Sequence, residues 1–302
     1  AYPLELVALL MLAAVIVFGV ESGGAKRWLG YGELSFQPSE MMKIALVMLL
    51  AAYYAWLDPA KVSRPLWVIP PLILILAPVA LVLTQPDLGT SIMLLLGGGA
   101  VMFLAGVSLW YFGAAIAAAV GLVTMVFESR GTDWQLLRDY QFNRIDTFLD
   151  PSKDPLGTGY HITQAQIALG SGGLSGRGYM QGTQSRLNFL PEKHTDFIFT
   201  TLAEEFGVMG SVALLLIFTL VVVFCVSSAI SNRDRFGALL TGGVGATFFF
   251  FFAVNMGMVM GLMPVVGVPL PMVSYGGSAM LVLMAAFGLA QSAHVHRPRA
   301  RD

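Results

Sequence analysis

The sequence predicts an all-α polytopic membrane protein with about eight transmembrane helices and one large extracytoplasmic loop. Of its 302 residues, 56% are hydrophobic and 12% are charged, whereas soluble domains carry about 25% charged residues. The mean hydropathy is +0.74. Eight runs of mostly apolar residues approach the length of about 20 residues that a helix needs to cross a bilayer. The chain is therefore expected to fold within a membrane.

The eight predicted spans follow one another through short connections, except for a long loop after the fifth span. They cover residues 3–20, 39–57, 66–84, 88–106, 109–127, 207–229, 236–261 and 275–294. The net charge is −1, which gives no support for nucleic acid as a partner. The single cysteine, Cys225, lies in an apolar run, so a disulfide scaffold and a cysteine-rich metal site are both excluded.

Basic residues in the short loops predict the orientation, because Lys and Arg accumulate on the cytoplasmic side of a membrane. They follow the second, sixth and eighth spans, at Lys61, Arg64, Arg233, Arg235, Arg297, Arg299 and Arg301. The pair Lys26 and Arg27 in the first loop opposes this assignment. With the even-numbered loops in the cytoplasm, the long loop over residues 128–195 is extracytoplasmic.

The long loop has the composition of an ordered segment. The stretch DYQFNRIDTFLD mixes aromatic, aliphatic and charged residues, and YHITQAQIALG has apolar residues at helical spacing. Glycines are dense in GSGGLSGRGYMQG, but their spacing fits neither a dinucleotide fingerprint nor a P-loop. Tight turns are the favoured interpretation. The alternative is a phosphate approached by backbone N–H groups, with Arg177 nearby.

Charged side chains within or beside the apolar spans predict functional positions, because a charge in lipid is costly unless it faces water or a partner. These residues are Glu40, Lys43, Asp87, Asp196, Glu204 and Glu205. Glu40 and Lys43 are three residues apart and share a helix face. Their spacing fits an internal ion pair between helices as well as a substrate contact. Asp87, in QPDLGTS, is placed to cap the helix that follows.

The segment NFLPEKHTDFIFTTLAEEFG, where the long loop re-enters the membrane, contains the most polar groups. Glu192, Lys193, His194 and Asp196 lie at this junction. A carboxylate shielded there by Phe197 and Phe199 could have a raised proton affinity and act as a general base. His194 could be a base or a metal ligand, but one His and one Asp fall short of the usual three or four ligands. A solvated histidine is favoured.

The last loop reads LMPVVGVPLPMVSYGGSAM and breaks the helical pattern with three prolines and three glycines. These residues leave backbone groups unpaired, which is tolerated at membrane depth only where protein or water surrounds them. The pattern predicts a re-entrant or cavity-lining loop. A tight connector between the last two spans is the alternative.

Five ordered blocks of sequence carry a family resemblance. They are RWLGYGELSFQPSEMMKIA, QPDLGTS, DPLGTGYHITQAQIALGSGGLSGRG, GTQSRLNFLPEKHTDFIFTTLAEEFG and PVVGVPLPMVSYGGSAML. Together they resemble the SEDS (shape, elongation, division and sporulation) family of bacterial peptidoglycan glycosyltransferases, and its elongation members more than its division members. The match runs from Arg27 to about His296. Because the family usually has ten spans, the resemblance implies a single SEDS domain over residues 1–302 that lacks the first two helices.

The resemblance implies an inverting glycosyltransferase that polymerises lipid II, an undecaprenyl-diphosphate-linked disaccharide-pentapeptide, into glycan strands for cell elongation and rod shape. The catalytic aspartate of the family matches Asp196. We expect substrate contacts from Trp28, Arg27, Glu40, Lys43, Asp87, Lys193, His194 and Arg177. The implied partner is a class B penicillin-binding protein, a transpeptidase, within the elongation complex. The implied location is the bacterial cytoplasmic (inner) membrane, with the active site on its extracytoplasmic face.

The chemistry of this reaction suits the residues. A sugar hydroxyl is a poor nucleophile and benefits from a carboxylate base, and a pyrophosphate needs positive charge from residues such as Lys43, Arg27, Arg177 or Lys193. Pyrophosphate leaves readily, so the second carboxylic acid that a glycosidase uses is less needed. A divalent cation, Mg²⁺ or Mn²⁺, could help instead, although no metal site of protein ligands is predicted.

Two other functions fit parts of the pattern. A lipid II flippase would also need spans, buried charges and a broken last loop, but a transporter places its charges near the midplane of the membrane. Asp196 and its neighbours lie at the outer boundary instead, which favours the enzyme. A non-catalytic scaffold for the transpeptidase would need no buried carboxylates, and their number argues against it.

Overall fold

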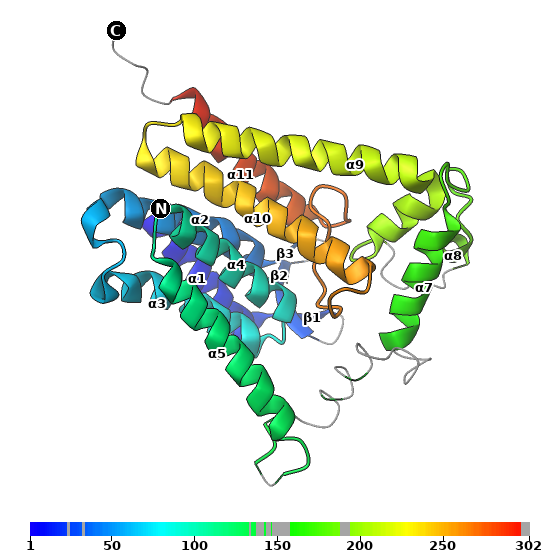
Figure 1. The fold of residues 1–302 in the computed structure, drawn as a ribbon, viewed down its shortest axis with the longest axis horizontal. Helices are drawn as coiled ribbons and strands as arrows, with labels where there is room; N and C mark the ends of the chain where they lie inside the picture. Colours follow the sequence, from blue (N-terminus) through cyan, green and yellow to red (C-terminus); the bar gives the residue numbers. More distant parts are fainter. Residues whose placement is uncertain are drawn as a thin grey trace.

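The computed structural model describes residues 1–22, 25–31, 34–132, 134–136, 142, 146, 158–187 and 194–296. Figure 1 shows the chain as a helical bundle from which the helix Leu109–Glu128 (α5) projects. The helices are α1 (Tyr2–Phe18), α2 (Pro38–Trp56), α3 (Pro65–Thr84), α4 (Leu88–Leu104), α5 (Leu109–Glu128), α7 (Thr158–Ser171), α8 (Thr183–Arg186), α9 (Ile198–Ser231), α10 (Arg235–Val259) and α11 (Gly277–Val295), with a short 3₁₀ turn, η1 (Pro59–Lys61). The strands are β1 (Val20–Ser22), β2 (Ala25–Tyr31) and β3 (Leu34–Phe36).

The predicted helical membrane fold is confirmed. The eight expected spans coincide with α1 to α5 and α9 to α11. Among the described helices, α3, α5, α9, α10 and α11 are long and apolar enough to cross a membrane, whereas α1 and α4 are shorter apolar helices. The presence of helices at all eight positions is therefore established, and the number of complete crossings stays a prediction.

Prolines and carboxylates mark where several helices begin. Pro38 and Pro65 occupy the first positions of α2 and α3, where the missing N–H would have had no partner within the helix. Asp87 accepts a hydrogen bond from the Thr90 amide at 3.0 Å and so caps α4. Asp234 caps α10 in the same way. The predicted capping role of Asp87 is confirmed.

A three-stranded antiparallel sheet joins α1 to α2, and the sequence analysis did not anticipate it. Val20 of β1 pairs with Trp28 of β2, and Leu29 of β2 pairs with Phe36 of β3. Strands of three to seven residues are too short for an alternating pattern to be recognised between two apolar helices. The sheet carries Arg27 and Trp28, and β2 packs against α1 and α2.

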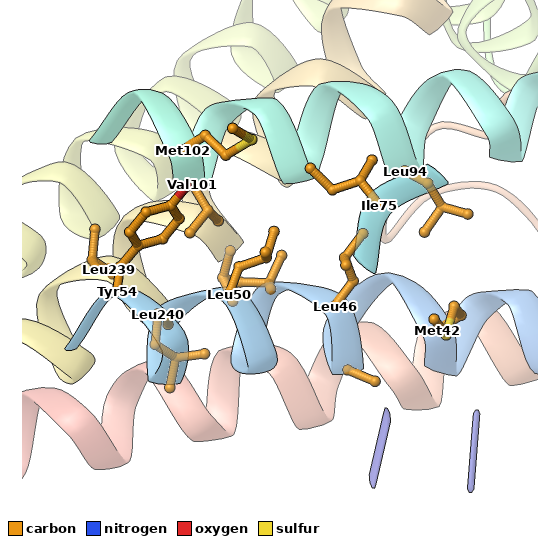
Figure 2. Close-up of a cluster of buried hydrophobic side chains, with 14 of the residues drawn as sticks. Met42, Leu46, Leu50, Tyr54, Ile75, Leu94, Val101, Met102, Leu239 and Leu240 are labelled. Atoms are coloured by element: carbon orange, nitrogen blue, oxygen red, sulfur yellow. The ribbon is translucent and has the colours of Figure 1, made fainter. Parts of the chain in front are cut away.

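Helix α10 lies at the centre of the bundle, where it packs against α2, α4, α9 and α11 (Figure 1). Glycines permit this close packing: a Cβ added to Gly245 would lie 2.5 Å from the Cβ of Cys225. Small residues at such crossings are typical of membrane helices. Figure 2 shows the core cluster that α2 forms with α3, α4 and α10. In contrast, every residue of α5 is at least partly exposed.

Helix α9 bends sharply at Gly207, which has φ 64° and ψ −159°, a combination open essentially only to glycine. The bend frees backbone N–H groups, and the glycine-rich segment satisfies them. Val208 N–H donates to the Gly173 carbonyl at 3.0 Å, and Met209 N–H donates to the Leu174 carbonyl at 3.2 Å. The favoured interpretation of that segment as tight turns is confirmed, with a packing role against α9. The predicted sixth span starts at the bend.

The loops gather into two groups at opposite ends of the bundle. In one group the Ser63 hydroxyl donates to the Gly106 carbonyl, and Arg235 donates to the Leu57 carbonyl at 2.8 Å. This group contains the basic residues that follow the second and sixth predicted spans, Lys61, Arg64, Arg233 and Arg235. In the other group, Arg27 contacts the connection between α3 and α4. The connection between α10 and α11 contacts the start of α9 in this same group. We call the second group the outer end.

Candidate active site at the outer end

Asp196 lies at the outer end, in the turn that precedes α9. Its side chain is half-buried, and Phe197 and Phe199, each 4% exposed, follow it into the apolar core. Asp196 therefore has aromatic residues on one side and the end of the bundle on the other, and its position at the outer boundary of the membrane stays a prediction. A carboxylate in such a place can receive a proton from a group that approaches from outside.

The connection between α10 and α11 holds the backbone around Asp196. Ser274 donates its hydroxyl hydrogen to the Thr195 carbonyl at 2.6 Å, and Tyr275 N–H donates to the His194 carbonyl at 2.8 Å. The side-chain amide of Asn255, in α10, donates to the Asp196 carbonyl at 2.9 Å. Three successive peptide groups are thus anchored to neighbouring elements.

Glu40 and Lys43 form a buried ion pair in the first turns of α2. Lys43 Nζ lies 2.8 Å from Glu40 Oε1 and 4.3 Å from the centre of the Phe251 ring. The pair lines a pocket whose other wall includes Ser274 and Tyr275 of the broken loop, together with apolar residues of α10 and α11. The predicted pairing and the predicted cavity-lining loop are both confirmed. Substrate contact by the pair stays a prediction.

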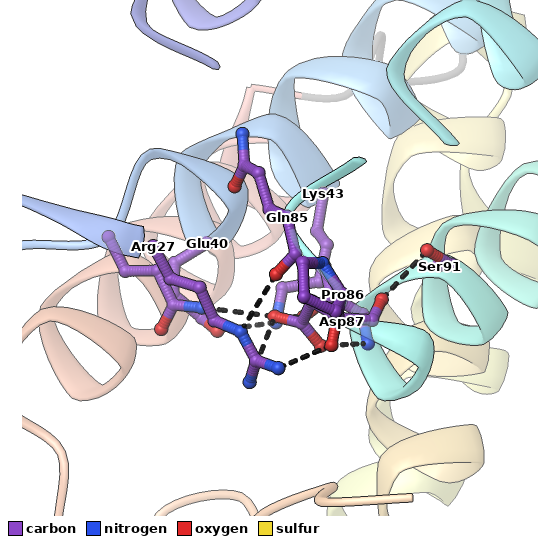
Figure 3. Close-up of polar contacts among 9 residues, drawn as sticks. Arg27, Glu40, Lys43, Gln85, Pro86, Asp87 and Ser91 are labelled. Carbon is purple, nitrogen blue, oxygen red and sulfur yellow. Dashed lines mark hydrogen bonds and ion pairs between the residues drawn. The ribbon is translucent and has the colours of Figure 1, made fainter. Parts of the chain in front are cut away.

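Arg27 and Asp87 meet beside the first turn of α2 (Figure 3). Arg27 donates to the backbone carbonyls of Gln85 and Pro86, and its guanidinium lies 4.0 Å from the Asp87 carboxylate. Gln37, the residue before α2, reaches the same carboxylate at 3.4 Å. Both oxygens of Asp87 are therefore used in structural contacts, whereas the Arg27 side chain is 34% exposed.

Of the remaining predicted residues, Trp28 and His194 adjoin the cluster, Arg177 lies elsewhere, and Lys193 is outside the described residues. Arg177 is exposed, and its Nε lies 3.4 Å from the Ser171 carbonyl near the bend of α9. His194 is exposed as predicted, and Trp28 is half-buried on β2. Lys193 falls among the residues that the structure does not describe. Arg27, Glu40, Lys43, Asp87 and Asp196 all lie at the outer end.

Glu204 has a structural role. It is fully buried, and its Oε1 accepts hydrogen bonds from the Thr183 hydroxyl at 3.1 Å and the Gln184 amide at 2.9 Å. These groups form the first turn of α8, so Glu204 caps that turn. A buried carboxylate therefore need not belong to the site.

Two site residues were missed in the sequence analysis. Asn255 is a fully buried amide in the seventh predicted span, and a polar residue at that depth is itself a signal of function. Ser274 was part of the broken loop, but nothing in its neighbours indicates that its hydroxyl reaches Thr195, 79 positions earlier. Such long-range contacts need the three-dimensional fold.

Within the described part of the chain, no three His, Cys, Asp or Glu side chains are grouped so that they could hold a metal ion. The divalent cation that the chemistry would allow therefore has no set of protein ligands there. No step proposed below depends on a metal.

The fold and the site define a class: a multi-pass membrane protein with a half-buried carboxylate, Asp196, beside a broken loop that also lines a largely apolar pocket. Residues 2–299 match the family described as "Cell cycle protein", which groups FtsW, RodA and SpoVE. The chain is 45% identical over 302 residues to the peptidoglycan glycosyltransferase MrdB of Escherichia coli (strain K12), covering 97% of this chain and 77% of MrdB. The chain therefore belongs to the FtsW/RodA/SpoVE family, which is the SEDS family that the sequence resembles.

Solved structures agree with this assignment. One chain, from "Structural coordination of polymerization and crosslinking by a peptidoglycan synthase complex", is 33% identical, with a TM-score of 0.83 over 99% of this chain and 82% of that chain. The rod shape determining protein RodA of Thermus thermophilus is 29% identical, with a TM-score of 0.69 over 99% of this chain and 79% of RodA. The fold is therefore the one that these family members share.

Proposed function

We propose that this protein is a peptidoglycan glycosyltransferase that polymerises lipid II into glycan strands for cell elongation. The observation that carries the proposal is the position of Asp196, which is half-buried at the outer end on a backbone anchored by three hydrogen bonds. Relatives with the same fold are named for this activity. The loop between α10 and α11, which holds this backbone, also lines the pocket that contains the Glu40–Lys43 pair.

In the proposed reaction, Asp196 takes the proton from an acceptor sugar hydroxyl. The hydroxyl oxygen forms a bond to the anomeric carbon of the donor, and the bond from that carbon to the diphosphate oxygen breaks. The diphosphate leaves with the electron pair, and the configuration at the anomeric carbon is inverted. General base catalysis of this kind contributes about 10²- to 10⁴-fold to a rate.

Positive charge on the substrate side supports binding of the diphosphate. The Arg27 side chain is partly exposed at the outer end, and a planar guanidinium suits phosphate oxygens. Lys43 is buried beside Glu40, so it would contact a phosphate only from inside the pocket. Arg177 and Lys193 are further candidates for the diphosphate, and Trp28, Asp87 and His194 are candidates for other parts of the substrate.

The proposed membrane face and partner of the enzyme rest on the predicted orientation and on the relatives. The basic loops at one end support a cytoplasmic position for that end, and we propose that the outer end faces the extracytoplasmic side of the bacterial inner membrane. A relative of known structure was solved in a complex that couples polymerisation to crosslinking. We therefore propose a class B penicillin-binding protein of the elongation complex as the partner of this chain.

The test uses purified protein in liposomes with labelled lipid II and the partner transpeptidase. We expect glycan polymers on a gel, and their release as short fragments after lysozyme treatment. A lipid II flippase would instead move labelled lipid between leaflets without forming polymer. Transbilayer movement with no polymer, under conditions where a related glycosyltransferase is active, would contradict the proposal.

A further inference from the structure

Both peptide groups that flank Asp196 are fixed by side chains from elsewhere in the fold. The peptide before it presents the Thr195 carbonyl, which accepts the Ser274 hydroxyl at 2.6 Å. The peptide after it presents the Asp196 carbonyl, which accepts the Asn255 amide at 2.9 Å. Because peptide groups are planar, restraining the two of them restricts φ and ψ of Asp196. The direction of its Cα–Cβ bond is then restricted as well.

Each of these two side chains also binds the broken loop. Asn255 donates a second hydrogen bond, at 2.7 Å, to the Val268 carbonyl, and the Ser274 oxygen accepts from Leu270 N–H at 2.7 Å. Both bridges therefore join the backbone of the turn before α9 to the loop between α10 and α11. Asn255 is fully buried, so water does not compete for its amide, and such bonds hold their geometry firmly.

The loop that provides this anchoring needs support of its own. Met272 has φ 63°, a left-handed conformation that is unfavourable for a residue with a side chain. Gly267 has φ 73°, and a Cβ there would lie 3.5 Å from Asp196 Oδ2. The loop thus passes beside the carboxylate in a conformation that the surrounding contacts must maintain.

We propose that Asn255 and Ser274 are positioning residues that hold Asp196 in its reactive orientation. The inference rests on the proposed function, because it assigns the reactive group to Asp196. Neither residue touches the reacting atoms in this account; each acts through the backbone. A displacement of about 1 Å at a reacting group can lower a rate about 10²-fold, so loss of either bridge should reduce turnover rather than lipid II binding.

The first variant is Ser274→Ala, with Ser228→Ala as its matched control. The Ser228 hydroxyl makes one hydrogen bond, 2.8 Å to His294 Nδ1, at the opposite end of the bundle. The control variant therefore also loses one hydroxyl hydrogen bond, but far from Asp196. We expect kcat of Ser274→Ala to fall about 10-fold or more with KM changed less than about twofold, and Ser274→Thr to restore most of the activity. An unchanged kcat, or a loss equal to that of Ser228→Ala, would overturn the proposal.

The second variant is Asn255→Leu, which keeps the branched shape and removes the donor. Its control is Asn232→Leu, because the Asn232 amide donates to the Ala293 carbonyl at 3.1 Å far from the site. If Asn255→Leu is poorly folded, the Ser274 variants still decide the question. Equal turnover per folded molecule in the two leucine variants would contradict a positioning role for Asn255.

A coupling measurement separates this inference from the proposed function. In an Asp196→Asn background, Ser274→Ala should cause no further loss of polymerisation, because it acts through the removed carboxylate. A full additional loss would overturn the inference. Hydrogen–deuterium exchange of residues 194–199 should be faster in Ser274→Ala than in Ser228→Ala, and equal exchange would also overturn it. Wild-type polymerisation by Asp196→Asn alone would refute the assignment of Asp196 as the base, and absence of polymer from the unmodified protein would refute the proposed function. In both cases the exchange result would still report the anchoring.

Discussion

Removing one partner of the Glu40–Lys43 pair should destabilise the protein strongly. The two charged atoms are 2.8 Å apart, and Glu40 and Lys43 are 9% and 7% exposed. At an effective dielectric constant of about 20, their attraction amounts to about 6 kcal/mol. Breaking a buried pair by removing one member typically lowers the free energy of unfolding by about 3–5 kcal/mol. We expect Lys43→Met to lie in this range.

The two single variants should differ in a defined way. Lys43 also lies over the Phe251 ring, with Nζ 4.3 Å from its centre. After Glu40→Gln the lysine keeps that contact, which stabilises a cation by about 0.5–2 kcal/mol. After Lys43→Met the Glu40 carboxylate has no ion-pair partner among the described residues, so this variant should be the less stable of the two. The combined variant, Glu40→Gln with Lys43→Met, has no charge at positions 40 and 43. It should therefore be more stable than Lys43→Met alone.

The assay is denaturant titration in detergent, followed by lipid II polymerisation on the same preparations. Asp146→Asn is the control, because Asp146 pairs with Arg130 at a similar distance, 2.7 Å, but in an exposed position. The Arg130 side chain is 47% exposed and the Asp146 side chain is 26% exposed. Its cost should be at most about 1 kcal/mol. A combined variant as unstable as Lys43→Met would refute the pairing argument. A stable combined variant with normal polymerisation would refute substrate contact by the pair.

Three further predictions concern the bend, the orientation and the partner. Gly207→Ala should lower the free energy of unfolding by about 1–3 kcal/mol, because the backbone conformation of Gly207 excludes a side chain. Gly121→Ala in α5, where an added Cβ meets open space, should leave the free energy of unfolding unchanged. Equal stability of the two variants would argue against the bend. In intact cells an impermeant thiol reagent should modify Ser175→Cys and should not modify Arg64→Cys or the buried Cys225. Modification of Arg64→Cys alone would contradict the predicted orientation. A class B penicillin-binding protein should co-purify with the protein from detergent, and failure to recover it would contradict the proposed partner.

The helical part of the fold was predictable because lipid imposes a simple rule on sequence. Apolar runs of bilayer length must form helices to satisfy their backbone groups, and all eight runs did. The sheet between α1 and α2 was not predictable, since its strands are short and lie at the end of the bundle. The bend at Gly207 was indicated only indirectly, by the start of the apolar run at that glycine.

The charged residues of the site, and those of their contacts that depend on local spacing, could be predicted from the sequence. Three-residue spacing was enough to pair Glu40 with Lys43, and the sequence QPDLGTS was enough to make Asp87 a cap. The same reasoning placed Glu204 with the functional candidates, whereas the fold uses it to cap α8. The contacts of Asn255 with Asp196 and of Ser274 with Thr195 could not be predicted, because they join positions 59 and 79 residues apart.

The measurement that tests the central claim most directly compares Asp196→Asn with Asp234→Asn in one experiment. Asparagine keeps the shape of the side chain but cannot accept the proton, so Asp196→Asn should melt normally and polymerise lipid II about 10²-fold or more slowly. Asp234 caps α10 at the opposite end, so Asp234→Asn should lose no more than about 2 kcal/mol of stability and keep its activity per folded molecule. Near-normal polymerisation by Asp196→Asn would contradict the account.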